Sequence, residues 1–115
     1  MTVNERIIAA LGGFGDPAAY GAYITAGAQK ADQYYVFNYS TLGTDYADDT
    51  PGHERYLIQV HFFCPRVFDS VLRVAQTKQK LFAAGFTWPS VINASDEDGQ
   101  HIVFECEIAA AAGVE

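Results

Sequence analysis

The chain is poor in the residues that nucleic-acid surfaces, metal sites and disulfide frameworks need. It has only seven Lys and Arg against fourteen Asp and Glu, with three His and two Cys in 115 residues. The net charge of −7 opposes binding to nucleic acid or to anionic lipid, because phosphate neutralisation needs clustered cations. We therefore expect no nucleic-acid specificity and no membrane contact.

Long apolar runs are also absent. The longest, around Tyr56–Pro65, is too short and too interrupted to span a bilayer. The segment Met1–Arg6 lacks the basic region and apolar stretch of a secretory signal. Half of the residues are hydrophobic, with eight Phe and seven Tyr, which favours a folded core. The length predicts a single domain over residues 1–115, located in the cytoplasm.

No constellation for catalysis, cofactor binding or metal binding stands out. Cys64 and Cys106 lie in apolar strand-like runs and are expected to be reduced core residues. His53, His61 and His101 are scattered, without metal-ligand spacing. A dyad of His61 and Cys106 would need both on one face of the sheet, whereas strand alternation places them on opposite faces. We expect a protein that is not an enzyme and has no cofactor.

Two segments have the 3.6-residue periodicity of amphipathic helices. The apolar positions of the first are Val3, Ile7, Ile8 and Leu11. The second is expected over Val67–Ala84, with Gly85 as its C-terminal cap. Its expected buried stripe consists of Val71, Val74, Ala75, Lys78, Leu81 and Phe82.

The remaining segments predict strands. We expect a hairpin of Ala18–Thr25 and Tyr34–Thr41 around a loop at Ala26–Gln33, a strand at Arg55–Phe63, and a hairpin of Ser90–Ala94 with Ile102–Ile108. The tail Ala109–Glu115 is expected to fray. This order predicts an α+β fold, an antiparallel sheet of four to five strands with two helices packed on one face. Its expected core contains Ile58, Val60, Val71, Leu81, Phe82 and Phe104.

Two features predict contact surfaces. The connection Leu42–His53 is polar, rich in Gly and Pro, and longer than a hairpin needs, which is typical of a functional loop or a disordered one. It offers Tyr46 as an aromatic anchor among carboxylates, and these are Asp45, Asp48 and Asp49. The second surface bears Leu57 and Phe63, which alternate with the core positions of their strand. The alternatives are a solvated connector and a small domain that partly buries both sheet faces.

Three motifs in this region resemble a known family. They are Tyr35-Val36-Phe37-Asn38-Tyr39, then Asp45-Tyr46-Ala47-Asp48-Asp49, then Tyr56-Leu57-Ile58-Gln59-Val60-His61-Phe62-Phe63. A helix that ends in Ala84-Gly85-Phe86 follows, and then an acidic turn and an amphipathic strand. In this order, over roughly Ile7 to Ile108, the chain resembles the tail terminator, or tail completion, proteins of siphophages and prophages.

The resemblance implies a structural role in the virion. Proteins of this family form a ring, typically a hexamer, that caps the finished tail tube and docks onto the connector of the head. The implied partners are other copies of the chain, the tail tube protein and head connector proteins, and the implied location is the virion tail, or the host cytoplasm during assembly. A neck or head-completion protein is an alternative within virion assembly. A small ligand-binding domain is an alternative from another class.

Overall fold

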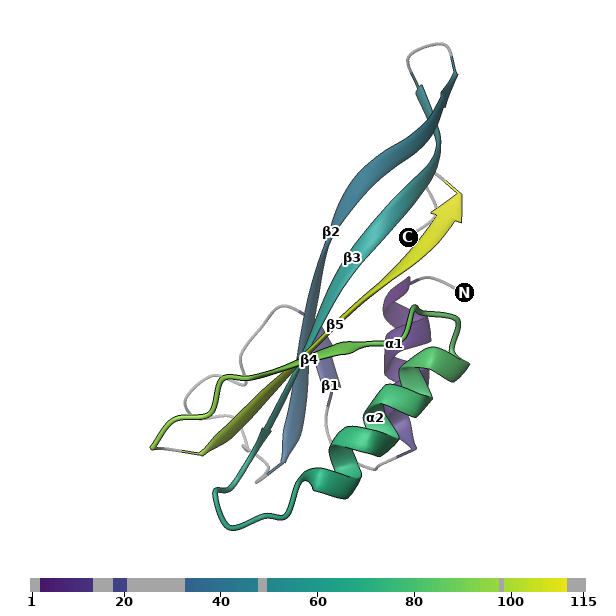
Figure 1. The fold of residues 1–115 in the computed structure, drawn as a ribbon. Helices are drawn as coiled ribbons and strands as arrows, with labels where there is room; N and C mark the ends of the chain where they lie inside the picture. Colours follow the sequence, from purple (N-terminus) through teal and green to yellow (C-terminus); the bar gives the residue numbers. More distant parts are fainter. Residues whose placement is uncertain (1–2, 14–17, 21–32, 48–49, 98, 112–115) are drawn as a thin grey trace.

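The computed structural model of the chain is an α+β fold in which two helices lie on one face of a twisted sheet (Figure 1). It describes residues 3–13, 18–20, 33–47, 50–97 and 99–111. The elements are α1 (Val3–Gly12), β1 (Ala18–Tyr20), β2 (Tyr34–Ala47), β3 (Thr50–Cys64), α2 (Val71–Ala83), β4 (Ser90–Asn93) and β5 (Gln100–Ala111). The predicted fold class is confirmed.

The sheet has the strand order β1-β2-β3-β5-β4, and its last four strands are antiparallel neighbours. The first strand differs from the prediction, because β1 runs parallel to β2 with Ala18 opposite Tyr35. A parallel pair cannot be a hairpin, since it needs a crossover of a dozen residues or more. The predicted hairpin is therefore wrong at β1, and its predicted loop lies almost wholly outside the described residues.

The predicted loop Leu42–His53 is also wrong, because β2 and β3 continue through it as one long hairpin. Their pairing runs from Tyr34 opposite Phe63 to Ala47 opposite Thr50. Pro51 and Gly52 are tolerated in β3 because the described part of β5 ends opposite His53. Beyond that point β2 is the one strand neighbour of β3 among the described residues, so the missing N–H of Pro51 costs no bond to a third described strand.

We call the outer part of this hairpin, residues 42–47 and 50–53, the arm. It projects past the helices at the top of Figure 1. The molecule measures 53 × 30 × 24 Å and has a radius of gyration of 15.2 Å. A compact chain of this length has a radius of gyration of about 13 Å. The arm therefore makes the molecule elongated. The predicted fraying of the tail is wrong up to Ala111, which pairs with His53 at the base of the arm.

The core lies between the sheet and the helices. Alternate residues of three strands face the helices, namely Tyr35, Phe37, Tyr56, Ile58, Val60, Phe62, Ile102, Phe104 and Cys106. The helices contribute Val3, Ile7, Leu11 and Leu81. Of the predicted core, Ile58, Val60, Leu81 and Phe104 are confirmed as buried. The prediction is wrong for Val71 and Phe82, which are 77% and 56% exposed.

The second helix begins later than predicted, at Val71 rather than Val67. A turn comes first, in which Phe68 N–H donates to the Pro65 carbonyl at 3.0 Å. Gln100 holds this turn from β5: its amide donates to the same carbonyl at 3.1 Å and accepts from the Ser70 hydroxyl at 2.7 Å. The helix end is as predicted, because Gly85 has a positive φ of 103°, which suits a glycine cap.

The buried side of α2 is narrower than the predicted stripe. Thr77 and Leu81 are buried, and Val74 packs partly against the core. Tyr35 Oη lies 3.0 Å from Thr77 Oγ1, which itself donates to the Arg73 carbonyl at 2.8 Å. Because the threonine hydroxyl has one proton, Tyr35 must be the donor. This satisfied polar pair orients α2 so that Val71 and Phe82 face outward.

Candidate functional site: the open face of the sheet

The sheet face opposite the helices, which we call the open face, carries both predicted contact residues of β3. Leu57 and Phe63 lie on it because side chains alternate along a strand. Leu57 is 38% exposed and Phe63 is half-buried. The other open-face residues of β2, β3 and β5 are Tyr34, Val36, Asn38, Ser40, Arg55, Gln59, His61, His101, Val103, Glu105 and Glu107.

Aromatic rings stack across one end of this face. The rings of Tyr34 and Phe63 are 4.9 Å apart and nearly parallel at 16°. Phe63 stacks equally on His101, at 4.3 Å and 19°. Each of these pairs consists of directly opposite residues on neighbouring strands, the contact that stabilises sheets most directly. Phe63 is therefore held within a ring stack and is less available to a partner than the sequence predicted.

His61 and His101 form a hydrogen-bonded pair beside this stack, with Nδ1 of the first 2.7 Å from Nε2 of the second. Burial lowers the pKa of His61, His101 lowers it further, and Glu105 acts in the opposite direction. Burial also lowers the pKa of His101, against the attraction of Asp96. Two imidazolium charges at this separation would repel, so the pair is neutral or singly protonated near neutral pH.

A groove of about 640 Å³ occupies the middle of the open face. Its floor carries Asn38, Ser40, Leu57, Gln59, Glu105 and Glu107, and Thr87, Trp88 and Ser90 border it. Glu105 accepts from the Gln59 amide at 3.0 Å, and Glu107 pairs with Arg55 at 2.9 Å. The Gln59 amide is neutral, so this contact leaves the charge of Glu105 uncancelled. The groove is therefore acidic, and Leu57 and Trp88 are the exposed apolar side chains among the residues that line it.

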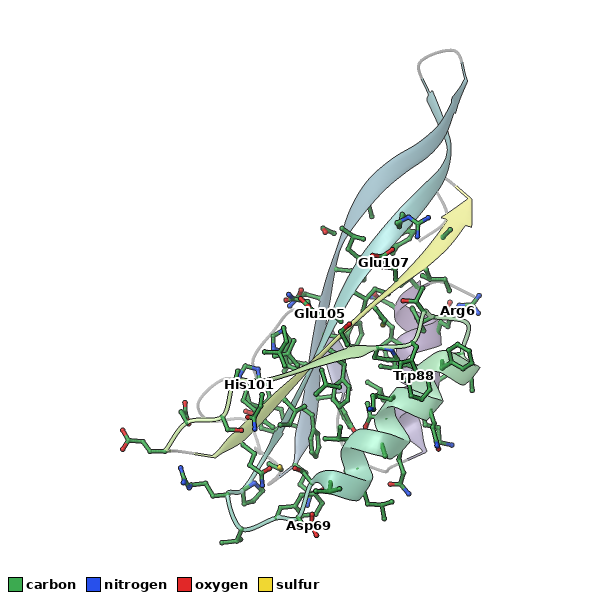
Figure 2. All side chains as sticks on the ribbon, viewed as in Figure 1. Arg6, Asp69, Trp88, His101, Glu105 and Glu107 are labelled. Carbon is green, nitrogen blue, oxygen red and sulfur yellow. The ribbon has the colours of Figure 1, made fainter. Side chains whose placement is uncertain are left out.

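Apart from Leu57, the residues of the groove were not singled out by sequence reasoning. Glu105 and Glu107 alternate with Phe104 and Cys106 in the last strand, which does place them on the outer face. The meeting of this strand with Gln59 and Asn38 could not be derived, because it depends on the strand order. Figure 2 shows Glu105 and Glu107 along β5, on the stretch where β3 pairs with it.

Two of the four contact residues predicted in Leu42–His53 lie in the described part of the chain. Asp45 and Tyr46 lie in β2 within the arm, with Tyr46 opposite Pro51. Asp48 and Asp49 lie outside the described residues. The arm and the groove are different parts of the molecule, so the structure does not gather the predicted contact residues into one site. The interface role of all six remains a prediction.

The thiols are buried away from the histidine pair. Cys64 and Cys106 are free and buried among the helix-facing residues, so His61 and Cys106 lie on opposite faces, as the alternation predicted. Burial, together with the smaller effect of the Glu107 carboxylate, raises the pKa of Cys106 to about 12. Within the described ranges, no three His, Cys, Asp or Glu side chains gather as a metal site requires. In the same part of the chain, no helix is long and apolar enough to cross a membrane.

Comparison with known proteins gives a fold and no family. No protein-family model matches the chain, and no curated protein does. A solved structure whose name describes no function superposes with a TM-score of 0.58 at 13% sequence identity. The match covers 98% of this chain and 95% of that chain. The likeness extends over nearly the whole of both chains, and at this identity it shows the fold alone.

Proposed function

We propose that the protein is a structural component of a phage tail, a terminator-like subunit that assembles into a ring, caps the tail tube and joins it to the connector of the head. The proposal rests on the order of the family-like motifs and on the arm. Two of these motifs, Tyr35–Tyr39 and Tyr56–Phe63, pair along the body of the β2–β3 hairpin. The third leads into its tip, with Asp45-Tyr46-Ala47 as the last described residues of β2.

The arm is the single observation that carries the proposal. A two-stranded hairpin with no third strand is marginally stable in water. The arm extends past the end of β5, so its outer residues pair only with each other among the described strands. Such a projection gains stability from a partner, through its exposed strand edges or its side chains. A ring subunit has neighbours that can supply this contact.

The buried thiols and the paired histidines suit a structural role better than a catalytic one. A thiol whose pKa is raised to about 12 stays protonated at neutral pH and is a poor nucleophile. The histidine pair is packed against aromatic rings. The ligand-binding alternative is favoured by one observation, the polar groove. Binding of a small molecule there would not require the arm, so the arm distinguishes the two functions.

Complementation of a phage that lacks the gene tests the proposal. Deleting residues 44–51 joins Gly43 to Gly52 and leaves a two-residue turn with Gly at its first position, which hairpins favour. The shortened chain should keep its fold by circular dichroism and fail to complement, leaving tails unjoined or of uncontrolled length in electron micrographs. Val67→Ser is the matched control, because Val67 is 96% exposed in a loop away from the arm. Full complementation by the shortened chain would contradict the proposal.

A further inference from the structure

The outward side of α2 exposes apolar side chains that the molecule does not bury. Val71 is 77% exposed and Phe82 is 56% exposed, and their spacing of eleven residues places them on one side of the helix. Phe82 packs edge-on against Trp88, with ring centroids 5.5 Å apart. Trp88 is itself half exposed and lies beside α2 in Figure 2. Phe82 and Trp88 form an exposed apolar pair of the kind that marks interaction surfaces, and Val71 lies about 16 Å further along the same side of the helix.

This surface is also cationic. Lys78 lies between Val71 and Phe82 on the helix, with its ammonium 5.7 Å from the centroid of the Trp88 ring. The helix contains three basic residues, Arg73, Lys78 and Lys80, and no acidic one. We call Val71, Lys78 and Phe82 the α2 stripe. Lys78 is the single charge of this stripe, because Lys80 lies about 200° around the helix and the Arg73 guanidinium lies over the Phe62 and Phe68 rings.

The groove on the open face has the complementary character. Glu105 and Glu107 supply negative charge, and Arg55 balances only Glu107. Leu57 supplies the apolar contact in its floor, at 38% exposure. The helices cover one face of the sheet (Figure 1), and the open-face residues of three strands form the floor of the groove on the other. The two surfaces meet at Trp88, which borders the groove and also packs on Phe82 of the stripe.

We propose that the α2 stripe of one copy docks in the groove of a second copy, with Lys78 facing Glu105 and with Phe82 against Leu57. This inference rests on the proposed ring and names its subunit contact. Because the two surfaces consist of different residues, each copy can give its stripe to one neighbour and its groove to another. Such a head-to-tail contact generates a ring if the rotation closes and a filament if it does not.

Charge reversal tests the contact in the purified chain. Sedimentation velocity over a wide concentration range should show that the wild type self-associates, less so at high salt. Lys78→Glu or Glu105→Lys alone should raise the dissociation constant about tenfold or more, because each change places like charges across the contact. An equimolar mixture of the two variants should recover association, since each stripe then meets a groove of opposite charge.

Matched controls separate the contact from net charge and from misfolding. Lys80→Glu makes the same charge change about 200° around α2 from Lys78, and Glu97→Lys makes it in the exposed β4–β5 turn. Neither control should change the dissociation constant by more than about twofold, the variation expected of exposed charges away from an interface. Glu105→Gln keeps the size of the side chain and should weaken association less than Glu105→Lys.

The outcomes also separate this inference from the proposed function. A wild type that stays monomeric throughout, or a mixture that does not recover association, overturns the stripe-to-groove contact. Equal weakening by the two controls overturns it as well. The proposed role in the tail would still stand on the arm-deletion result, which depends on phage complementation. If the arm deletion complements while the mixture recovers association, the contact stands and the tail role fails.

Discussion

Replacing Phe82 and Phe104 by Ala tests which side of α2 faces the core, because the sequence predicted both side chains to be buried and the structure buries only Phe104. Phe104 is fully buried in the core, opposite Val60 on one neighbouring strand and Val91 on the other. Phe82 is 56% exposed and packs on Trp88. Replacing a buried Phe by Ala costs about 3–5 kcal/mol, which combines the lost burial with the cavity left behind. For Phe82→Ala we expect about 1 kcal/mol, because most of the side chain is already in water and a solvated aromatic contact is weak.

The two variants should therefore differ clearly in thermal and chemical unfolding. For a chain of this length each kcal/mol moves Tm by roughly 3–5 °C, so Phe104→Ala should lower Tm by about 10–20 °C. The expected shift for Phe82→Ala is about 3–5 °C. Urea unfolding should show a lower midpoint with an unchanged slope in both cases. Equal losses, or a larger loss for Phe82→Ala, would refute the orientation of α2 described above.

Three further outcomes are expected. Tyr35→Phe removes the hydrogen bond to Thr77 inside the core and should cost about 1 kcal/mol in urea unfolding, whereas an unchanged midpoint would show that the bond contributes nothing. The pKa values of His61 and His101 are lowered in the folded state, so the unfolded chain binds more protons below about pH 6.5. The free energy of unfolding should therefore fall as the pH drops below about 6.5, and it should level off below the folded-state pKa values. His101→Gln should flatten this decline in a pH series of urea midpoints, and an unaltered slope would exclude the pair as its cause. The combined variant Tyr46→Ala, Asp48→Asn and Asp49→Asn should keep the wild-type Tm and fail to complement a terminator-deficient phage, while full complementation would reduce the arm tip to a connector.

The body of the sheet could be predicted because its strands carry a strong period-2 signal. In Arg55–Phe63 the alternation assigned Ile58 and Val60 to the core and Leu57 to the other face, and the register agrees. The terminal hairpin was found from its acidic turn ending in Asp98-Gly99. These signals are local, so they do not depend on which strands become neighbours.

The long hairpin and the parallel edge strand could not be predicted, because both depend on pairing between distant parts of the chain. Pro51 and Gly52 are strand breakers in isolation, and they are tolerated in β3 because the described part of β5 ends opposite His53. The sequence of Ala18–Tyr20 is equally compatible with either strand direction. The hydrogen bonds from Gln100 to the turn before α2 could not be predicted from the sequence, because they join residues about thirty positions apart.

The wrong prediction that Val71 and Phe82 of α2 are buried has a different origin, and these two residues belong to the proposed contact surface. Hydrophobic periodicity indicates which positions are apolar, and it does not specify which side of a broad apolar surface faces the core. The apolar positions of α2 include Val71, Val74, Leu81 and Phe82, and only Val74 and Leu81 of these pack in the core. The hydroxyl pair of Thr77 and Tyr35 selects that side, because burying Val71 and Phe82 instead would turn Thr77 away from its partner. Val71 and Phe82 therefore stay exposed in the single chain. In the proposed contact, the groove of a second copy covers them.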